Sequence, residues 1–119
     1  MSKSKKDNIL FRAKDPRGKE VELRRDQLES HLKQRDQAHL TDPLEIKDTI
    51  EDPVFILQDS AHIRRQDYFK ASEKKAKKDL YKKVVVHFKS ESEPGDVVTA
   101  YITSSVNPRS SEDVLWRKE

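Results

Sequence analysis

The sequence predicts an α+β fold built around an antiparallel sheet. The predicted elements run from a β-hairpin through two helices to four strands, without the strand–helix alternation of a parallel sheet. Only 33% of the residues are hydrophobic and 39% are charged, so the chain can bury only a thin core. We therefore expect an N-terminal β-hairpin, with two helices packed on one face of a four- to five-stranded antiparallel sheet.

Residues 9–24 predict the N-terminal hairpin. A turn containing Pro16 and Gly18 separates an apolar start from a second segment, in which Val21 and Leu23 alternate with charged residues. This alternation is typical of a strand that is buried on one face only.

Asp26 and Glu29 form a capping box, which predicts a helix that runs to about Ala38. The apolar stripe of this helix is thin and carries His31 at its edge. Because an imidazole on a buried stripe needs a polar partner, His31 is either half-exposed or borders a polar cleft.

The clearest helix start in the chain is at Asp42, which is a favoured N-cap residue. Pro43 suits the first helical position, Glu45 extends the acidic first turn, and Pro53 ends the helix.

Strands are predicted over residues 54–57 and 62–70, the second with Tyr68 and Arg64 on one face. Residues 114–116 predict a last short strand or a helical turn.

The strongest hairpin signal spans residues 81–103. Two segments rich in β-branched and aromatic residues flank a polar connection that contains the only Pro–Gly pair, Pro94–Gly95. Alternation places Val84 and Val86 toward the core. The opposite face collects groups that transfer protons or bind phosphate, together with one valine: Lys83, Val85, His87, Thr99, Tyr101 and Thr103.

At 119 residues the chain predicts one domain, over residues 8–119, after a disordered basic segment at 1–7. It has no cysteine, and no apolar run approaches the ~18 residues that a membrane span requires. We therefore expect a cytoplasmic protein without disulfides and without a membrane partner.

The charge pattern and the missing motifs limit the available chemistry. Seven lysines lie between Lys70 and Lys83, and such a run either attracts phosphate groups or is an ordinary solvated surface. There is no glycine-rich phosphate loop, and the four histidines lack zinc-ligand spacing, so neither a metal nor a cofactor is expected. The remaining residue types suit RNA cleavage, in which a 2′-hydroxyl attacks the adjacent phosphorus.

Five motifs, in this order and over residues 8–116, resemble phage-associated families of the barnase–EndoU–colicin–RelE (BECR) ribonuclease fold. They are His31-Leu32-Lys33-Gln34-Arg35-Asp36, Thr49-Ile50-Glu51-Asp52-Pro53, Tyr68-Phe69, Lys82-Lys83-Val84-Val85-Val86 and Val98-Thr99-Ala100-Tyr101. Asp36 stands where the family pattern has a second histidine, which leaves His31 as the main candidate on its helix.

The resemblance implies a small metal-independent endoribonuclease of toxin or prophage type, which cleaves tRNA, mRNA or rRNA to a 2′,3′-cyclic phosphate. It allows for an antitoxin or immunity protein as a partner. It assigns proton transfer to His31, phosphate binding to Lys83, orientation of the phosphate to Tyr68 and a hydrogen bond to Thr99. The proposed substrate-binding residues are Arg35, Arg64, Arg65, Lys82, His87 and Tyr101.

Alternation alone brings His87 into this set, and it allows at most one of Arg64 and Arg65 to line the site. Two other functions are open: a non-catalytic RNA- or protein-binding module on the same fold, and a phage protein that docks on a host factor. Catalysis requires that His31, Tyr68, Lys83 and Thr99 converge on one point.

Overall fold

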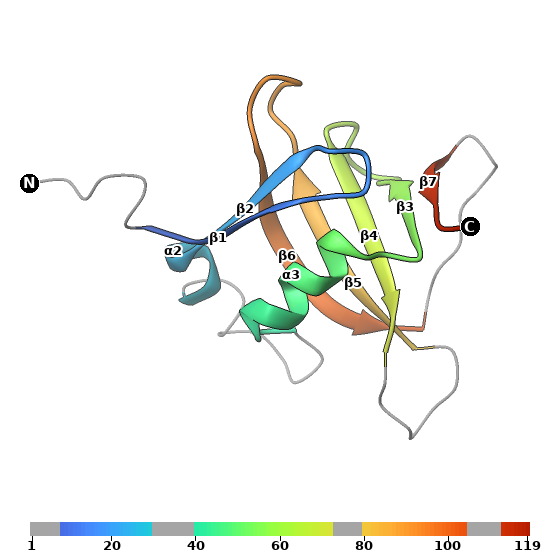
Figure 1. Cartoon of the computed structure of the whole chain (residues 1–119), viewed down its shortest axis with the longest axis horizontal. Helices are drawn as coiled ribbons and strands as arrows, with labels where there is room; N and C mark the ends of the chain where they lie inside the picture. Colours follow the sequence, from blue (N-terminus) through green and yellow to red (C-terminus); the bar gives the residue numbers. More distant parts are fainter. Residues whose placement is uncertain (1–7, 30–39, 73–79, 105–112) are drawn as a thin grey trace, which may run out of the picture.

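The computed structural model describes residues 8–29, 40–72, 80–104 and 113–119. The described strands belong to one seven-stranded sheet, accompanied by two short helices (Figure 1). The strands are β1 (Ile9–Lys14), β2 (Glu20–Arg24), β3 (Phe55–Gln58), β4 (Arg65–Ala71), β5 (Tyr81–His87), β6 (Gly95–Thr103) and β7 (Val114–Arg117). The helices are α2 (Arg25–Gln27) and α3 (Pro43–Glu51).

The strand order across the sheet is β1-β2-β6-β5-β4-β3-β7. All neighbours pair antiparallel except β2 and β6, which pair in parallel through Val21 with Gly95 and Glu22 with Asp96. Helix α3 crosses one face of the sheet and contacts β1, β4 and β5 (Figure 1). Neither described helix is long and apolar enough to cross a membrane.

The predicted four- to five-stranded antiparallel sheet under two helices is wrong. The N-terminal hairpin does form, but it extends the main sheet through the parallel β2–β6 contact, and the tail adds β7 beside β3. A parallel contact between segments so far apart in sequence leaves no local signature. The sheet is therefore mixed and wider than predicted.

The structure confirms the helix predicted from Asp42. The side chain of Asp42 accepts a hydrogen bond from Leu44 N at 2.9 Å, and Pro43 occupies the first turn. Of the helix predicted up to Ala38, the structure describes α2 and the residues up to Glu29; the rest lies outside the described residues.

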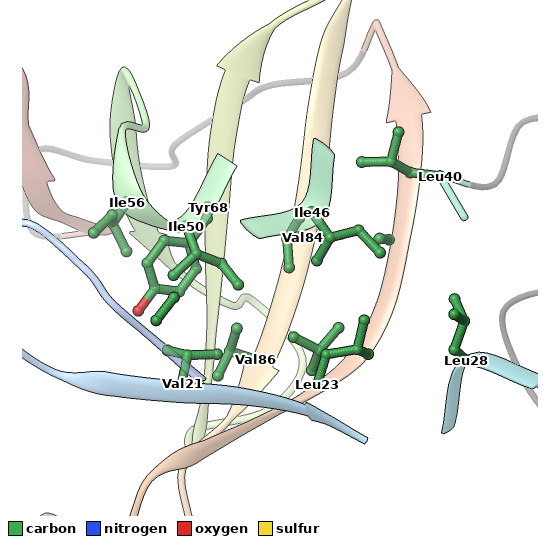
Figure 2. Packing of buried hydrophobic residues seen from close by; sticks show 13 residues of the cluster. Val21, Leu23, Leu28, Leu40, Ile46, Ile50, Ile56, Tyr68, Val84 and Val86 are labelled. Atoms are coloured by element: carbon green, nitrogen blue, oxygen red, sulfur yellow. The ribbon is translucent and has the colours of Figure 1, made fainter. Parts of the chain in front are cut away.

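The hydrophobic core lies between α3 and the sheet. Ile46 and Ile50 of α3 are fully buried, and they belong to one cluster with residues from β1 to β6 (Figure 2). The cluster is Ala13, Val21, Leu23, Leu28, Leu40, Ile46, Ile50, Ile56, Tyr68, Val84, Val86, Val97 and Ala100. A main core on one side of the sheet is what a chain with few apolar residues can build. Leu57, Phe69 and Val85 are buried on the opposite face.

A register shift between Val85 and Val86 changes which residues of β6 face the core. Val97 is buried in the cluster, whereas alternation from Ala100 alone would place Val98 there. The shift also brings Asp96 opposite His87.

Gly95 is buried at the start of β6, where the parallel contact with β2 forms. A Cβ atom at Gly95 would lie 2.5 Å from Val86 Cγ1 and 2.6 Å from the Phe88 ring. A glycine is therefore required at position 95 because no side chain fits there. Gly18, in contrast, has a positive φ of 87°.

We predict that Gly95→Ala lowers the free energy of unfolding by about 1–3 kcal/mol, because Val86 and Phe88 must move to admit the methyl group. Urea denaturation measures the change. Ser104→Ala, which alters an exposed residue just after β6, is the control and should stay within about 0.5 kcal/mol of wild type. Equal stability of the two variants would contradict the prediction.

Candidate functional site on the open face of the sheet

The register assigns each strand residue to one of two faces. Tyr68, Val84 and Ala100 lie side by side on β4, β5 and β6, and all three are buried in the core under α3. Because neighbouring residues point to opposite sides of a sheet, their neighbours lie on the other face. We call this the open face; it holds the row Asp67, Val85, Thr99 and the row Phe69, Lys83, Tyr101.

Tyr68 lies on the face opposite Lys83 and Thr99. Its side chain is fully buried in the core (Figure 2). Its hydroxyl donates a hydrogen bond to Asp15 Oδ2 at 2.6 Å. Burial, followed by the neighbouring Asp15 carboxylate, raises the pKa of Tyr68 far above its usual value. Tyr68 therefore holds the β1–β2 turn to the sheet and cannot meet a phosphate bound by Lys83.

The turn that Tyr68 holds is organised by the fully buried side chain of Asp15. Asp15 accepts hydrogen bonds from the backbone N–H groups of Arg17 and Lys19, at 2.8 and 3.1 Å. The guanidinium of Arg17 donates to Asp15 at 2.7 Å and to Gln66 of β4 at 2.6 Å. This network is a structural link between β1, β2 and β4.

The other predicted site residues fall into four groups. Lys82 points toward α3, where its Nζ lies 3.6 Å from Glu45, so it is not on the open face. Arg64 is exposed just before β4 and donates a hydrogen bond to the carbonyl of Lys89. His31 and Arg35 lie outside the described residues. Those on the open face are Arg65, Lys83, His87, Thr99 and Tyr101.

A carboxyl pair and an ammonium group lie together on this face. The Asp67 side chain is only 9% exposed, and its Oδ2 lies 3.7 Å from Lys83 Nζ. Lys83 Nζ also lies 5.4 Å from the centre of the Tyr101 ring and 5.6 Å from that of Phe69. Asp59, just after β3, is hydrogen-bonded to Asp67 and accepts from the N–H groups of Ala61 and His62, at 2.8 and 3.0 Å.

Burial and the hydrogen bond to Asp59 raise the pKa of Asp67 to about 7. Burial also acts to raise the pKa of Asp59, but the bonds from Ala61, Asp67 and His62 hold it below its usual value. The proton therefore resides on Asp67. A proton shared by the two carboxyls supplies a hydrogen bond that two ionised carboxylates lack.

Lys83 keeps its charge although it is half-buried. Burial favours its neutral form, but the hydroxyl of Tyr101 and the carboxylate of Asp67 outweigh burial and raise its pKa. At neutral pH the open face thus offers a fixed cation next to a carboxyl that exchanges its proton.

Three buried polar atoms on the open face have no hydrogen-bond partner within the described part of the chain. They are Arg65 Nε, Asp67 Oδ1 and His87 Nδ1. Arg65 and His87 are direct cross-strand partners, and Asp67 is two residues further along β4. Unpartnered buried polar groups are rare in folded proteins, and a catalytic role is one of the recognised reasons for them.

An aromatic cluster adjoins these polar groups. Phe69 packs against Phe55 at 5.2 Å and Tyr81 at 6.4 Å between ring centres, and Phe55 and Tyr81 are 5.9 Å apart. Phe69 is buried, whereas Phe55 and Tyr81 are half-buried. The cluster and the carboxyl pair meet at Lys83, which contacts Phe69.

Sequence reasoning missed Asp59, Asp67 and the outward position of Phe69. Alternation grouped Tyr68 with Arg64 on the face taken as polar, and Phe69 on the opposite face, whereas the structure buries Tyr68 in the core and places Phe69 on the open face. The available signal was Asp67 itself, because aspartate is disfavoured inside a strand and needs a specific reason to be there.

Two surface hollows that are lined by described residues lie elsewhere. One, of about 590 Å³, is bounded by the β1–β2 turn and the β5–β6 connection, and a second, of about 500 Å³, adjoins it near Arg12 and Asp96. Both mix acidic and basic residues and contain none of the open-face groups, so the chemistry points to the open face rather than to these hollows. No group of three or more potential ligands for a metal occurs among the described residues.

Comparisons of the chain with protein-family models, with curated proteins and with solved structures gave no match.

Proposed function

We propose that the protein is a small metal-independent endoribonuclease that uses the open face of its sheet. Attack of a 2′-hydroxyl on the adjacent phosphorus yields a 2′,3′-cyclic phosphate and releases the 5′-oxygen. The reaction needs a group that accepts the hydroxyl proton, a group that protonates the leaving oxygen, and a cation to offset the charge on phosphorus. RNA in the cytoplasm is the proposed substrate, with an antitoxin or immunity protein as a proposed partner.

The observation that carries the proposal is Asp67 beside Lys83. A carboxyl whose pKa is about 7 is populated in both protonation states near neutral pH, which suits a group that transfers protons. Lys83 Nζ, 3.7 Å from this carboxyl, is a cation next to which a phosphate can bind.

Two hydroxyl groups complete the proposed phosphate site. Tyr101 lies opposite Lys83, and Thr99 lies opposite Val85 on the same face. Both side chains are half-buried and able to donate hydrogen bonds to phosphate oxygens. Asp67 supplies one proton-transfer group, and the resemblance to the ribonuclease family supports His31 as the second. Tyr68 has no part in this site.

Total RNA incubated with the protein in EDTA tests the function. The expected products are fragments that end in a 2′,3′-cyclic phosphate, and His31→Ala is expected to reduce their formation. Intact RNA at high protein concentration, with wild type and His31→Ala indistinguishable, would overturn the proposal.

The second candidate function is an RNA-binding module without cleavage. The aromatic cluster beside Lys83 favours it, because stacking of bases on aromatic rings binds RNA without any chemistry. RNA that is retained on a filter by the protein but stays intact would select this function.

Lys83→Ala is predicted to weaken RNA binding and to reduce its salt dependence. One lost phosphate contact lowers the slope of log affinity against log salt concentration by about 0.7 on single-stranded RNA. Lys82→Ala is the matched control, because Lys82 is the preceding residue of β5 but pairs with Glu45 under α3. Titration of an uncleavable 2′-O-methyl RNA measures both slopes; equal slopes for Lys83→Ala and wild type would remove Lys83 from the site.

A further inference from the structure

We infer that the aromatic cluster of Phe55, Phe69 and Tyr81 is a base-stacking subsite. It would take one unpaired base of the RNA whose phosphate lies at Lys83. This inference rests on the proposed function, because it assigns the cluster to the same substrate.

The cluster combines one buried residue, Phe69, with two half-buried residues, Phe55 and Tyr81. Phe69 is 2% exposed and lies opposite Phe55 in the β3–β4 register. Tyr81 lies opposite Ala71, diagonal to Phe69, and its ring meets that of Phe69 edge-on at 85°. Phe55 and Tyr81 both keep part of their surface accessible.

The charge next to the cluster decides what it can bind. Lys83 Nζ lies 5.6 Å from the centre of the Phe69 ring, so an ammonium group borders the rings directly. A nucleotide carries a flat aromatic base and an anionic phosphate, and stacking platforms next to basic groups are how proteins bind single-stranded nucleic acid.

The consequence is selection for unpaired RNA. A base inside a duplex is stacked on its neighbours, and only an unstacked base can lie on an aromatic side chain. The subsite thus places an unpaired nucleotide beside Lys83, and cleavage is expected in loops and single-stranded segments.

Binding of 2′-O-methyl oligonucleotides tests the subsite independently of cleavage, since they have no 2′-hydroxyl to attack. We expect Phe55→Leu and Tyr81→Leu to weaken binding of a single strand by roughly five- to a hundred-fold, and Tyr81→Phe to bind like wild type. Phe11→Leu is the matched control, because Phe11 is a partly buried phenylalanine that packs against the core on the α3 side. A 2-aminopurine in the strand should lose fluorescence when wild type binds, which reports stacking without any variant.

The outcomes separate the subsite from the proposed function. Unquenched 2-aminopurine, or wild-type affinity in both leucine variants with only their melting temperature lowered, would show that the cluster merely stabilises the sheet, even if RNA is cleaved. Self-association of wild type without oligonucleotide binding would also overturn the subsite. Quenching that depends on the rings, together with intact RNA in the cleavage assay, would retain the subsite and refute the nuclease.

Discussion

Asp67→Asn is expected to lower the rate of RNA cleavage by about 100- to 10,000-fold, the usual contribution of a positioned acid or base. Asparagine has nearly the shape of aspartate but transfers no proton. Because the pKa of Asp67 is about 7, wild type should also show a change of rate near pH 7 that the variant lacks.

The control for this variant is Asp52→Asn, an exposed carboxylate after α3 that pairs with Lys70 and Lys118. Its rate should equal that of wild type. A folded Asp67→Asn protein with full activity would exclude Asp67 from proton transfer, and the acid and base would have to be sought at His31 and elsewhere.

The same carboxyl makes stability depend on pH. The pKa of Asp67 is about 7 in the folded protein against an ordinary value of 3.8, so the folded state holds the proton more tightly. Its contribution is complete below about pH 4 and is lost as the pH rises through 7. Relative to Asp67→Asn, wild type should lose roughly 4 kcal/mol of unfolding free energy over this range, at ~1.4 kcal/mol per pKa unit.

Asp15→Ala is expected to lower the free energy of unfolding by about 2–4 kcal/mol. The substitution removes a fully buried carboxylate and leaves the Tyr68 hydroxyl and two backbone N–H groups without their acceptor. Arg17 is 18% exposed and can turn toward water, which limits the loss. Asp48→Ala, which removes an exposed partner of Lys70, is the control and should lose less than ~1 kcal/mol.

A double-mutant cycle identifies the source of this stability. Tyr68→Phe removes only the hydroxyl, which donates to Asp15 at 2.6 Å. If this bond links the turn to the core, the double variant loses less unfolding free energy than the sum of the losses in Asp15→Ala and Tyr68→Phe measured separately. Strict additivity in urea denaturation would mean that the two groups do not act on each other.

Local patterns predicted the parts of the fold that depend on local rules. The alternation of β5 and β6 placed Lys83, Thr99 and Tyr101 on one face, as their register shows, because the period of two is a property of the backbone. The cap at Asp42 likewise marked the true start of α3. What lay beyond the sequence was the choice of face: alternation separates Tyr68 from Phe69 but does not say which side meets α3.

That choice decided the candidate site. The core accepts Tyr68 because Asp15, far away in sequence, satisfies its hydroxyl, and Phe69 points outward because Phe55 and Tyr81 cover it. Both reasons are tertiary contacts. The Asp59–Asp67 pair depends in the same way on the β3–β4 register, which brings the end of β3 beside β4.

The β2–β6 contact is the one parallel strand pair in the described sheet. Its two register pairs link the N-terminal hairpin to a strand near the other end of the chain, so most of the polypeptide forms the loop that this contact closes. Closing so long a loop costs more entropy than closing a short hairpin and slows folding relative to neighbouring hairpins. The β1–β2 hairpin is thus expected to dock last, onto an already formed β3–β6 meander. The close packing at Gly95 and the hydrogen bond between Tyr68 and Asp15 stabilise the docked hairpin.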